Sequence, residues 1–513
     1  MPSLSMKLTR RLAMAALAAS TALTALPAGP ALADQSNDTL VAAFRAQLPS
    51  LDRYHAPGRE GFLLGLLAYD TLVYRNTETF ELEPLIAKEW SQIDDLTYEF
   101  KLRDDVTFHN GDPLTAEDVA YTFLYAANPE NNVFNRTTPG WIDDVQVVDD
   151  YTVRVIAKEV TPLAMQYIVQ LPILPKAYRE KVGLQEFAEH PVGSGPYMIE
   201  GKDGNDIVFK AFDGYMKDGP KNVPEIGTLI YRAIPDVNTQ VAELISGGID
   251  WAWYIPDDQA QKLAQMPNLE VINAPTFRVA FLTMDAAGLT DAEGPLTDVR
   301  VRKAIAHAID REAIAKSLIG GSSETIPSAC NPAQYGCEQD VTEYDYDPEA
   351  ARALMAEAGY ADGFDIDIYG YRSRPVAEAI LGYLSEIGIR GNLVWQQYSA
   401  VIQSRRDHQT PLVIDDFGSA GVADTGAITT FFFGESPDDQ SRDPVVTEAI
   451  QEAGRIADQD RRAELFSTAL KQIADKAYWA PLFTVPINYV MSSDVDVPVP
   501  DDENVEFWRA TWK

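Results

Sequence analysis

Residues 298–321 read DVRVRKAIAHAIDREAIAKSLIGG, and this stretch carries the signals of a helix with one apolar face. Asp298 stands at the N-cap position, where its carboxylate can accept hydrogen bonds from N–H groups of the first turn. Apolar residues recur after it at helical spacing, and Gly320-Gly321 follow as a stop. The apolar residues are Val301, Ala304, Ile305, Ile309 and Ile314. The pattern predicts one helix from Asp298 to Gly320, packed against a core.

Further capped helices alternate with short strands along the chain. Asp347 precedes Pro348 and an apolar-periodic run that stops at Gly359, and Thr115 with Asp118 resembles a capping box. Runs rich in β-branched and aromatic residues lie between the helices and are typical of strands. The strongest of these runs are 96–102, 152–156, 207–209, 229–233 and 279–284. We find no repeat or heptad array, so the sequence predicts an α/β or α+β protein.

Length and charge limit the classes of function. A chain of 513 residues exceeds one ordinary hydrophobic core, so we expect two or more lobes. It has 42 Lys and Arg against 77 Asp and Glu, a net charge of −35. Such a surface repels phosphates and anionic lipid, so we expect neither nucleic acid nor a membrane as a direct partner.

Residues 1–33 are typical of an export signal. Lys7, Arg10 and Arg11 form a basic start, residues 12–26 are apolar, and 31–33 read ALA, a small-residue cleavage site. The apolar run is shorter than the roughly 20 residues that span a bilayer. The pair Arg10-Arg11 keeps a twin-arginine route open beside the general secretory route. We therefore expect an exported, soluble periplasmic protein.

The two cysteines, Cys330 and Cys337, lie far from this signal. A lipid-anchored exported protein needs a cysteine at its cleavage site, so we expect no lipid anchor. In an oxidising compartment the two are expected to form a disulfide. A metal or redox pair is the alternative, but the spacing is not CxxC and no histidine lies near.

Catalytic and metal-binding motifs are missing from the sequence. None of the five histidines forms HExxH or HxxEH. His109-Asn110-Gly111 could begin a metal loop, but Asn-Gly after a strand favours a turn. The segment 193–196, GSGP, lacks the Lys-Ser/Thr of a P-loop, and no GxSxG occurs. We expect no catalytic site, no metal and no cofactor.

Several blocks together resemble the family 5 extracellular solute-binding proteins, the group of oligopeptide, dipeptide and nickel receptors. They stand in order over nearly the whole chain after residue 40. The blocks are 67–72 (LAYDTL), 85–90 (LIAKEW), 96–103 (LTYEFKLR), 106–111 (VTFHNG), 192–197 (VGSGPY), 298–305 (DVRVRKAI), 308–311 (AIDR) and 346–351 (YDPEAA). Each is weak alone, and their order makes the resemblance specific.

The resemblance implies a bilobed clam, the periplasmic-binding-protein-like fold, with a ligand buried between the lobes. It implies that closure around the solute is recognised by an ABC permease, a mechanism that suits a monomer. Strand-like runs at 276–284 and 482–490 suit a two-strand hinge. The implied division is lobe 1 at 34–76, 191–277 and 484–513, an extra subdomain of lobe 1 at 77–190, and lobe 2 at 278–483.

Ligand contacts are expected from loops that face the cleft. Three aromatics after residue 250 could stack on a planar group or cage a cation, with lobe core as the alternative. An arginine in the cleft would clamp a carboxylate, with solvent or a lobe–lobe ion pair as the alternative. The residues predicted to bind ligand are Tyr54, His55, Trp251, Trp253, Tyr254, Arg278, Arg372, Arg374, Phe417 and Asp424.

The stretch 415–424, DDFGSAGVAD, departs from the family pattern. Peptide receptors commonly have a Trp there, followed by an Asp-Tyr-Pro-Asp-Pro-like run whose Asp holds the peptide amino group. Here Phe417 replaces the Trp, and Asp424 is a looser candidate for the amine anchor. This puts a standard peptide ligand in doubt, and the lack of a histidine cluster argues against directly bound nickel.

The sequence therefore predicts a periplasmic receptor that delivers a small organic solute, such as a peptide, an amino-acid derivative or a similar charged compound, to an ABC permease. Two alternatives remain: a receptor that hands its ligand to a membrane signalling protein, and an exported hydrolase, which would need catalytic residues that the motifs do not provide.

Overall fold

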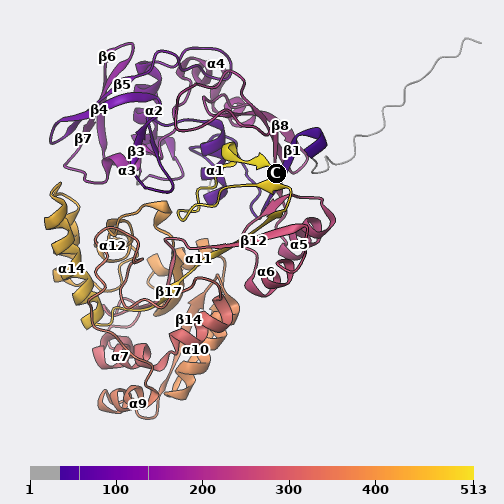
Figure 1. The fold of residues 1–513 in the computed structure, drawn as a ribbon. Helices are drawn as coiled ribbons and strands as arrows, with labels where there is room; N and C mark the ends of the chain where they lie inside the picture. Colours follow the sequence, from indigo (N-terminus) through magenta and orange to yellow (C-terminus); the bar gives the residue numbers. More distant parts are fainter. Residues whose placement is uncertain (1–34, 57, 137) are drawn as a thin grey trace, which may run out of the picture.

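The computed structural model describes residues 35–513 apart from 57 and 137. The predicted signal segment, 1–33, lies outside the described residues. Figure 1 shows two lobes, an upper one in indigo to magenta and a lower one in pink to gold, with the yellow C-terminal segment back in the upper lobe. The predicted mixture of strands and helices is confirmed.

A seven-stranded sheet forms the centre of the upper lobe. Its strands, in spatial order, are β12 (Leu269–Ala274), β18 (Ile487–Ser492), β11 (Trp251–Ala252), β1 (Thr39–Phe44), β10 (Thr228–Ala233), β9 (Asp206–Ala211) and β8 (Tyr197–Asp203). Every residue of β1 is buried. Alternate side chains of a strand point to opposite faces, so Phe44 packs toward α1 (Gly58–Ala68) and Val41 toward α5 (Val237–Ser246) and α6 (Asp257–Leu263).

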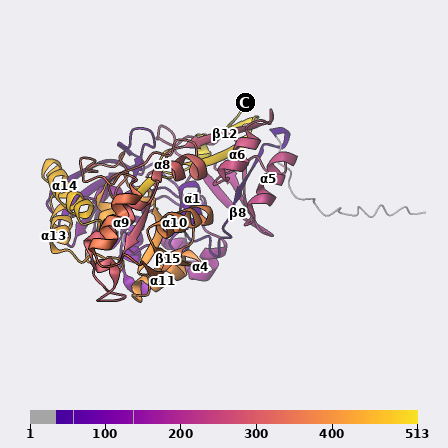
Figure 2. The same ribbon diagram turned by 90° about the horizontal axis from the view of Figure 1, so that it is seen from below.

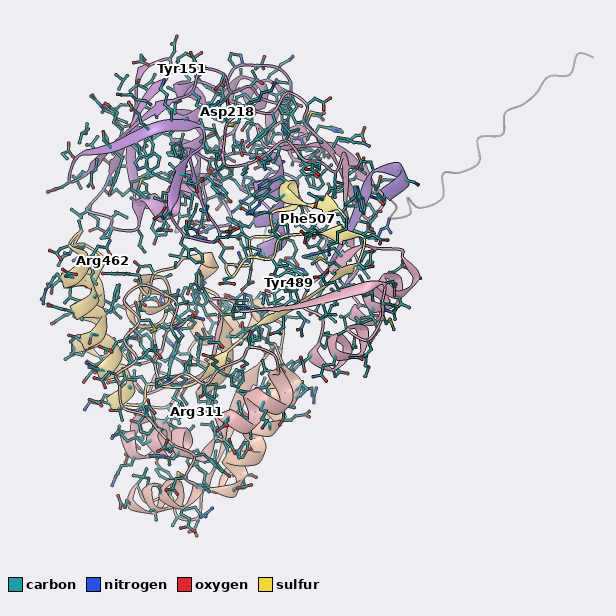
Figure 3. The ribbon with its side chains drawn as sticks, viewed as in Figure 1. Tyr151, Asp218, Arg311, Arg462, Tyr489 and Phe507 are labelled. Atoms are coloured by element: carbon teal, nitrogen blue, oxygen red, sulfur yellow. A yellow bond between two sulfur atoms is a disulfide. The ribbon has the colours of Figure 1, made fainter. Side chains whose placement is uncertain are left out.

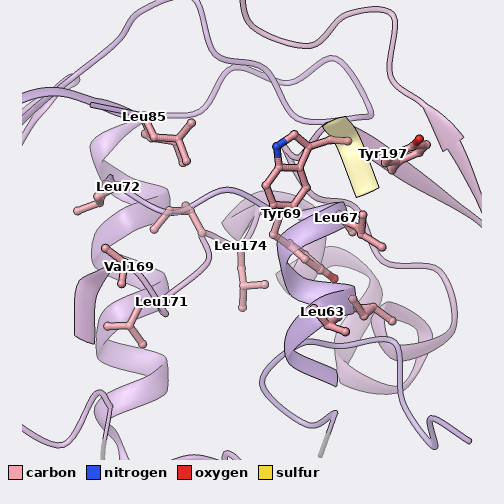
Figure 4. Close-up of a cluster of buried hydrophobic side chains, with 14 of the residues drawn as sticks. Leu63, Leu67, Tyr69, Leu72, Leu85, Val169, Leu171, Leu174 and Tyr197 are labelled. Atoms are coloured by element: carbon pink, nitrogen blue, oxygen red, sulfur yellow. The ribbon is translucent and has the colours of Figure 1, made fainter. Parts of the chain in front are cut away.

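A second, four-stranded sheet extends the core of the upper lobe. Its order is β4 (Ala87–Asp94), β5 (Thr97–Leu102), β7 (Thr152–Ala157) and β6 (Ile142–Asp149). Beside it lie the hairpin β2 (Val73–Arg75)–β3 (Leu82–Pro84) and the helices α2 (Ala116–Ala127), α3 (Ala164–Ile168) and α4 (Lys176–Glu189). Leu72, Leu85 and Leu174 join this layer to Leu63 and Tyr69 of the α1 region (Figure 4). One continuous core therefore supports both sheets.

The lower lobe is built on a five-stranded sheet. Its order is β15 (Ile389–Trp395), β14 (Phe364–Gly370), β16 (Leu412–Phe417), β13 (Val279–Met284) and β17 (Trp479–Thr484). Phe281 of β13 points to one face, where it stacks on Trp479 at 3.6 Å, and Leu282 points to the other. The helices around this sheet are seen from below in Figure 2. They are α7 (Val299–Ala308), α9 (Pro348–Glu357), α10 (Arg374–Glu386), α11 (Tyr398–Arg406), α12 (Gly426–Phe433), α13 (Pro444–Ala453) and α14 (Gln459–Asp475).

Short elements complete the chain. The two-stranded sheet β19 (Val495–Asp496)–β20 (Thr511–Trp512) lies in the upper lobe. The 3₁₀ turns are Gln35–Asn37, Pro129–Asn131, Pro295–Thr297, Ser419–Gly421 and Phe507–Arg509.

The chain passes between the lobes beside the strand ends of both sheets. It leaves β12 through Pro275 to enter β13, and returns from β17 through Val485-Pro486 into β18. The N–H of Val485 donates to the carbonyl of Arg278 at 2.9 Å, and the Thr276 hydroxyl donates to the carbonyl of Val485 at 2.7 Å. The predicted run 276–284 follows Pro275 and is a strand only from Val279, and the run 482–490 is interrupted at Val485-Pro486, because a proline cannot donate to a strand ladder. The two crossings are hydrogen-bonded to one another.

The single helix predicted from Asp298 to Gly320 is wrong. Asp298 does cap α7, accepting from Arg300 N at 2.8 Å, but α7 ends at Ala308 and Ile309 is extended. Asp310 then caps a separate helix, α8 (Arg311–Ile314), by accepting from Ala313 N at 2.9 Å, and a π-helical turn follows over Ala315–Ile319. The carbonyl of His307 instead accepts from Asp347 N, which takes an acceptor away from the next turn.

The other local predictions are confirmed. Asp347 caps α9 through Glu349 N and Ala350 N, and Gly359 has the positive φ of a helix stop. Thr115 N donates to Asp118 at 2.9 Å. The five predicted strands all occur within one or two residues. Cys330 and Cys337 form a disulfide, with their Cα atoms 5.8 Å apart.

His109 is part of a tight turn, as predicted. Gly111 has φ +87°, and its N–H donates to Phe108 O at 2.8 Å. The imidazole Nδ1 accepts from Gly193 N at 3.2 Å, while Nε2 contacts Gly195 O at 2.9 Å. The ring therefore joins the turn to the 193–196 loop as part of the scaffold. Burial lowers the pKa of His109 to about 4.

Candidate functional site

A cavity of about 660 Å³ lies between the two lobes. Its upper wall contains the first turn of α1 and residues 254–257 after β11. Its lower wall contains residues 371–373 after β14 and the end of β16, and the crossings supply Arg278 and residues 485–488. A volume of this size is typical of a small-molecule site. Residues of both lobes would therefore contact an enclosed solute.

Five arginines line the cavity: Arg45, Arg53, Arg59, Arg278 and Arg372. Three acidic residues, Glu60, Asp257 and Asp416, share the lining. In a chain with a large excess of Asp and Glu, this concentration of guanidinium groups reverses the local sign of charge. The cavity is suited to an anionic or zwitterionic solute, because fixed charges set which partners a cleft attracts.

Two of the arginines belong to an ion-pair cluster that joins the lobes. Asp416 accepts from Arg278 NH1 at 2.5 Å and forms a salt bridge with Arg372 Nε at 2.8 Å. Arg278 NH2 also lies 3.4 Å from Glu503, which belongs to the C-terminal segment of the upper lobe. Burial lowers the pKa of Arg278, but Glu503, Tyr254 and Asp416 more than offset this and hold it well above its ordinary value. The cluster therefore joins positively charged arginines to carboxylates of both lobes.

Glu503 connects this cluster to the upper wall. Its carboxylate accepts from the Tyr254 hydroxyl at 2.6 Å and lies 3.5 Å from Arg59 NH2. Burial raises the pKa of Glu503, and Arg278 and Arg59 lower it by more, so that it stays below its ordinary value. Tyr254 has φ +54°, which turns its carbonyl toward Arg45 NH2 at 2.5 Å. This left-handed conformation thus sets the position of two polar groups in the upper wall.

Aromatic side chains supply the apolar part of the cavity. Phe62 and Phe134 come from the upper lobe, and Tyr371, Tyr398 and Phe417 from the lower. Phe134 and Tyr398 are more than half exposed, at 59% and 51%. Exposed rings on both walls offer stacking surfaces for a planar or apolar part of a solute.

Four of the residues predicted to bind ligand line this cavity: Tyr254, Arg278, Arg372 and Phe417. Tyr254 and Arg278 are engaged in the cluster around Glu503, so the alternative of a lobe–lobe ion pair describes Arg278. Arg372 pairs with Asp416 but remains 46% exposed at its side chain. Phe417 stacks on Phe431 at 5.1 Å.

The predicted ligand-binding residues at positions 54, 55, 251 and 253 lie outside the cavity lining. Trp251 and Trp253 are 0% and 1% exposed and pack against Phe44, so they occupy lobe core, the alternative given for them. Tyr54 donates to Pro172 O at 2.9 Å, and His55 Nε2 lies 2.9 Å from the Tyr125 hydroxyl. None of these four side chains is part of the cavity lining.

Arg374 and Asp424 also lie outside the lining. Arg374 forms an exposed pair with Glu378 at 2.9 Å, the solvated alternative. Asp424 is buried, accepts from Gly426 N at 2.8 Å and pairs with Arg462 at 3.0 Å. Figure 3 shows Arg462 on α14, well to the side of Tyr489 in β18. The structure thus places the suggested amine anchor in a structural ion pair.

Sequence reasoning missed Arg45, Arg53 and Arg59, which supply most of the upper wall's positive charge. A signal was present: three arginines fall within 15 residues of a chain in which acidic residues greatly outnumber basic ones. Tyr54 and His55 directly follow Arg53 in the same loop, but the cavity lining contains Arg53 and not these two side chains. Glu503 could not be anticipated, because it reaches the site from the far end of the chain.

The structure describes residues 35–56, 58–136 and 138–513. This part of the chain contains no group of three His, Cys, Asp or Glu side chains that could hold a metal ion. In the same residues, no helix combines the length and apolarity that crossing a bilayer requires. The positive charge and aromatic rings of the cavity are suited to reversible binding of a solute.

Two curated relatives match most of the chain. The dipeptide-binding protein of Escherichia coli K12 is 29% identical over 452 residues, which cover 80% of this chain and 82% of the relative. A glutathione-binding protein of Salmonella paratyphi A is 27% identical over 479 residues, covering 88% and 90%.

Solved structures share the fold. The dipeptide-binding protein from Pseudoalteromonas sp. SM9913, in complex with Met-Leu, superposes with a TM-score of 0.80 at 20% identity, covering 93% of this chain and all of the other. The bilobed fold inferred from the resemblance is confirmed. The profile of the bacterial extracellular solute-binding proteins, family 5 Middle, matches residues 81–440. The chain belongs to this family of bacterial extracellular solute-binding proteins.

Proposed function

We propose that this solute-binding protein captures a small charged organic solute in the periplasm and delivers it to the membrane permease of an ABC importer. The observation that carries the proposal is the cavity between the lobes, lined by five arginines and by aromatic rings from both walls. Relatives that bind dipeptides and glutathione support a solute of similar size. We propose binding without chemical turnover, by a soluble, exported monomer without a lipid anchor.

The crossings between the lobes support a hinge. Each contains a proline and lies outside the strands on either side, so rotation there would leave both sheets intact. We propose lobe 1 at 34–76, 191–277 and 484–513, its extra subdomain at 77–190, and lobe 2 at 278–483. A solute that contacts both lobes would favour the closed form by its differential affinity for that form.

A free peptide amine has no evident partner at Asp424, whose carboxylate is paired with Arg462. Asp416 lines the cavity, but it is already paired with Arg278 and Arg372. We therefore propose that solutes whose main charge is negative bind better than cationic peptides. The predicted contacts at Tyr254, Arg278, Arg372 and Phe417 remain part of the proposed site, to which Arg45, Arg53 and Arg59 are added.

A solute panel tests the receptor function. The purified full-length protein, refolded to remove carried-over ligand, is screened by thermal shift against organic acids, peptides, opines, sugars and amines. A solute at 100 times its Kd should stabilise the fold by roughly 2.7 kcal/mol. Small-angle scattering should then show a smaller radius of gyration with the solute bound. Chemical conversion of the solute by the protein, or the absence of any stabilising compound, would contradict the proposal.

A further inference from the structure

Arg53 differs from the other buried arginines of the molecule. It is 8% exposed, yet its guanidinium forms no hydrogen bond or ion pair with any residue that the structure describes. Four other buried arginines have carboxylate partners: Arg75 with Asp502, Arg179 with Asp52, Arg405 with Asp415 and Arg462 with Asp424. A fifth, Arg302, donates to the backbone carbonyls of Leu296, Thr297 and Lys476. A buried charge without a partner is costly. This cost calls for a partner that the residues described by the structure do not supply.

The acidic residue next in sequence does not satisfy Arg53. Asp52 accepts from Arg179 NH2 at 2.8 Å and from Tyr54 N at 3.0 Å, so both of its oxygens are already used. Burial lowers the pKa of Arg53, and the electrostatic attraction of Tyr54 and Asp52 only partly offsets this. The guanidinium is still charged at neutral pH.

Arg53 borders open space. It lines the main cavity and also a smaller cavity of about 50 Å³ within the upper lobe. The ring of Phe62 lies 5.1 Å from the guanidinium carbon. The stem packs on Gly65, where a Cβ would come within 2.4 Å of Arg53 Cδ. The side chain is therefore held in place by Gly65 and Phe62, and the residue borders volume that a solute can enter.

The first turn of α1 adds positive potential to the same wall. Gly58, Arg59 and Glu60 line the cavity, and α1 has 11 residues. The first N–H groups of a helix have no acceptors within the helix, and its N-terminus carries partial positive charge. Glu60 is the acidic residue in this turn, and it interacts electrostatically with Arg45. An anion in contact with Arg53 would lie beside a helix end that favours negative charge.

We propose that Arg53, supported by the first turn of α1, anchors a carboxylate of the transported solute, which is therefore an organic acid. This inference rests on the proposed function and names its solute class. The other cavity arginines are less available for this role. Arg278 and Arg372 share Asp416, Arg59 contacts Glu503, and Arg45 donates to the Tyr254 carbonyl. A guanidinium fork matches a carboxylate with two parallel hydrogen bonds.

Malonate is the probe for this anchor, and malonamide is its uncharged counterpart. Thermal shifts of the full-length protein are measured in sodium malonate, sodium phosphate and malonamide, with sodium chloride holding the ionic strength constant. Wild-type protein should be stabilised by malonate and not by malonamide. Arg53→Met should weaken malonate binding at least tenfold. Arg374→Met, which removes an exposed arginine outside the cavity, should leave malonate binding within twofold of wild type.

A second prediction concerns the stability of Arg53→Met in the absence of any ligand. Because the variant removes an unpaired buried charge and keeps an apolar stem, its Tm should be higher than that of wild type by a few degrees. Arg53→Lys keeps the charge but loses the fork, so its malonate affinity should fall between those of wild type and Arg53→Met. A structural role for Arg53 would instead lower the Tm of the methionine variant.

Three results would overturn the anchor: no malonate response in wild type, equal malonate affinity in wild type and Arg53→Met, or a lower Tm in unliganded Arg53→Met. A phosphate response as strong as that to malonate would replace the carboxylate by phosphate as the preferred group. A neutral solute from the panel that stabilises wild type and Arg53→Met equally would overturn the anchor and leave the receptor function standing. Failure of malonate and of every solute in the panel would overturn both.

Discussion

The Arg462–Asp424 pair and the Arg278–Glu503 contact both bury opposite charges, but they lie in different parts of the molecule. Arg462 and Asp424 both belong to the lower lobe and are 3.0 Å apart. Arg278 and Glu503 come from opposite sides of the crossing and are 3.4 Å apart, at the edge of the cavity. Separation of the lobes would leave the first pair together, because both partners belong to one lobe, whereas it would part the second.

This difference explains why Asp424 is a poor ligand anchor. Its neighbourhood is closed by the disulfide loop: Tyr335 N donates to Ala423 O at 3.1 Å, and Thr425 N donates to Tyr335 O at 3.0 Å. Cys330 and Cys337 enclose Tyr335 within that loop. Both oxygens of Asp424 already accept hydrogen bonds from Arg462. Charge inside a lobe therefore serves the fold, and charge between the lobes is available for closure and for binding.

Breaking the pair inside the lower lobe should have the largest effect. Arg462→Met leaves the Asp424 carboxylate buried without its cation, so we expect a loss of about 3–5 kcal/mol in the free energy of unfolding, measured in urea. Adding Asp424→Asn to the same protein should restore part of that loss. Arg461→Met is the matched control, since Arg461 is exposed and pairs with exposed Glu452 and Glu464. It should change stability by less than about 0.5 kcal/mol. Equal losses in the two variants would contradict the distinction.

A second prediction concerns a contact inside the upper lobe, the turn at His109, and it is tested by varying the pH. His109 has a pKa of about 4 in the folded protein, lowered by burial, against an ordinary value near 6.5. The unfolded chain therefore binds more protons between these values, and stability falls as pH drops from 6.5 to 4. At 1.36 kcal/mol per pKa unit, the loss in wild type should reach about 3 kcal/mol.

His109→Asn should remove this part of the pH dependence, because asparagine does not titrate. The pH dependence of stability is measured by urea unfolding at several pH values between 7 and 4. His408→Asn, which replaces an exposed histidine outside this turn, is the control variant. If wild type and His109→Asn lose stability in parallel as the pH falls, His109 does not contribute to acid sensitivity.

Local structure could be predicted from the sequence where one residue determines it. Asp347 and Asp298 cap helices whatever surrounds them, and Gly111 gives the turn after His109. The break after α7 could not be predicted, because it depends on Asp347 N taking the His307 carbonyl across 40 residues. Apolar periodicity continues through the break and conceals it.

The candidate site was harder to predict for the same physical reason. Trp251 and Trp253 looked like stacking residues, but their strand, β11, pairs between β1 and β18 in the middle of a sheet. A central strand buries both of its faces. Burial and pairing depend on contacts between distant segments, so composition alone could not separate Arg53 from the paired Arg462.

Glu503→Gln should give the smallest change in stability and the clearest change in lobe separation. The variant removes the negative charge that Arg278 and Arg59 share, and the Tyr254 hydroxyl keeps an acceptor in the amide oxygen. Because the contacts at 3.4–3.5 Å are long for ion pairs, we expect a loss of only about 1–2 kcal/mol. The unliganded variant should have a larger radius of gyration in small-angle scattering than wild type at pH 7.

Lowering the pH of the wild-type protein should separate the lobes as Glu503→Gln does. Burial raises the pKa of Glu503, but Arg278 and Arg59 together hold it below its ordinary value. The inter-lobe contribution is therefore complete above about pH 4.5 and is lost as the pH falls below it. Wild type should expand in this range, while Glu503→Gln should change little. Glu506→Gln is the control, because Glu506 pairs with Arg509 and accepts from Tyr74 within the upper lobe. Expansion of Glu506→Gln, or a compact Glu503→Gln, would show that the lobes are held together by contacts other than the charges around Arg278.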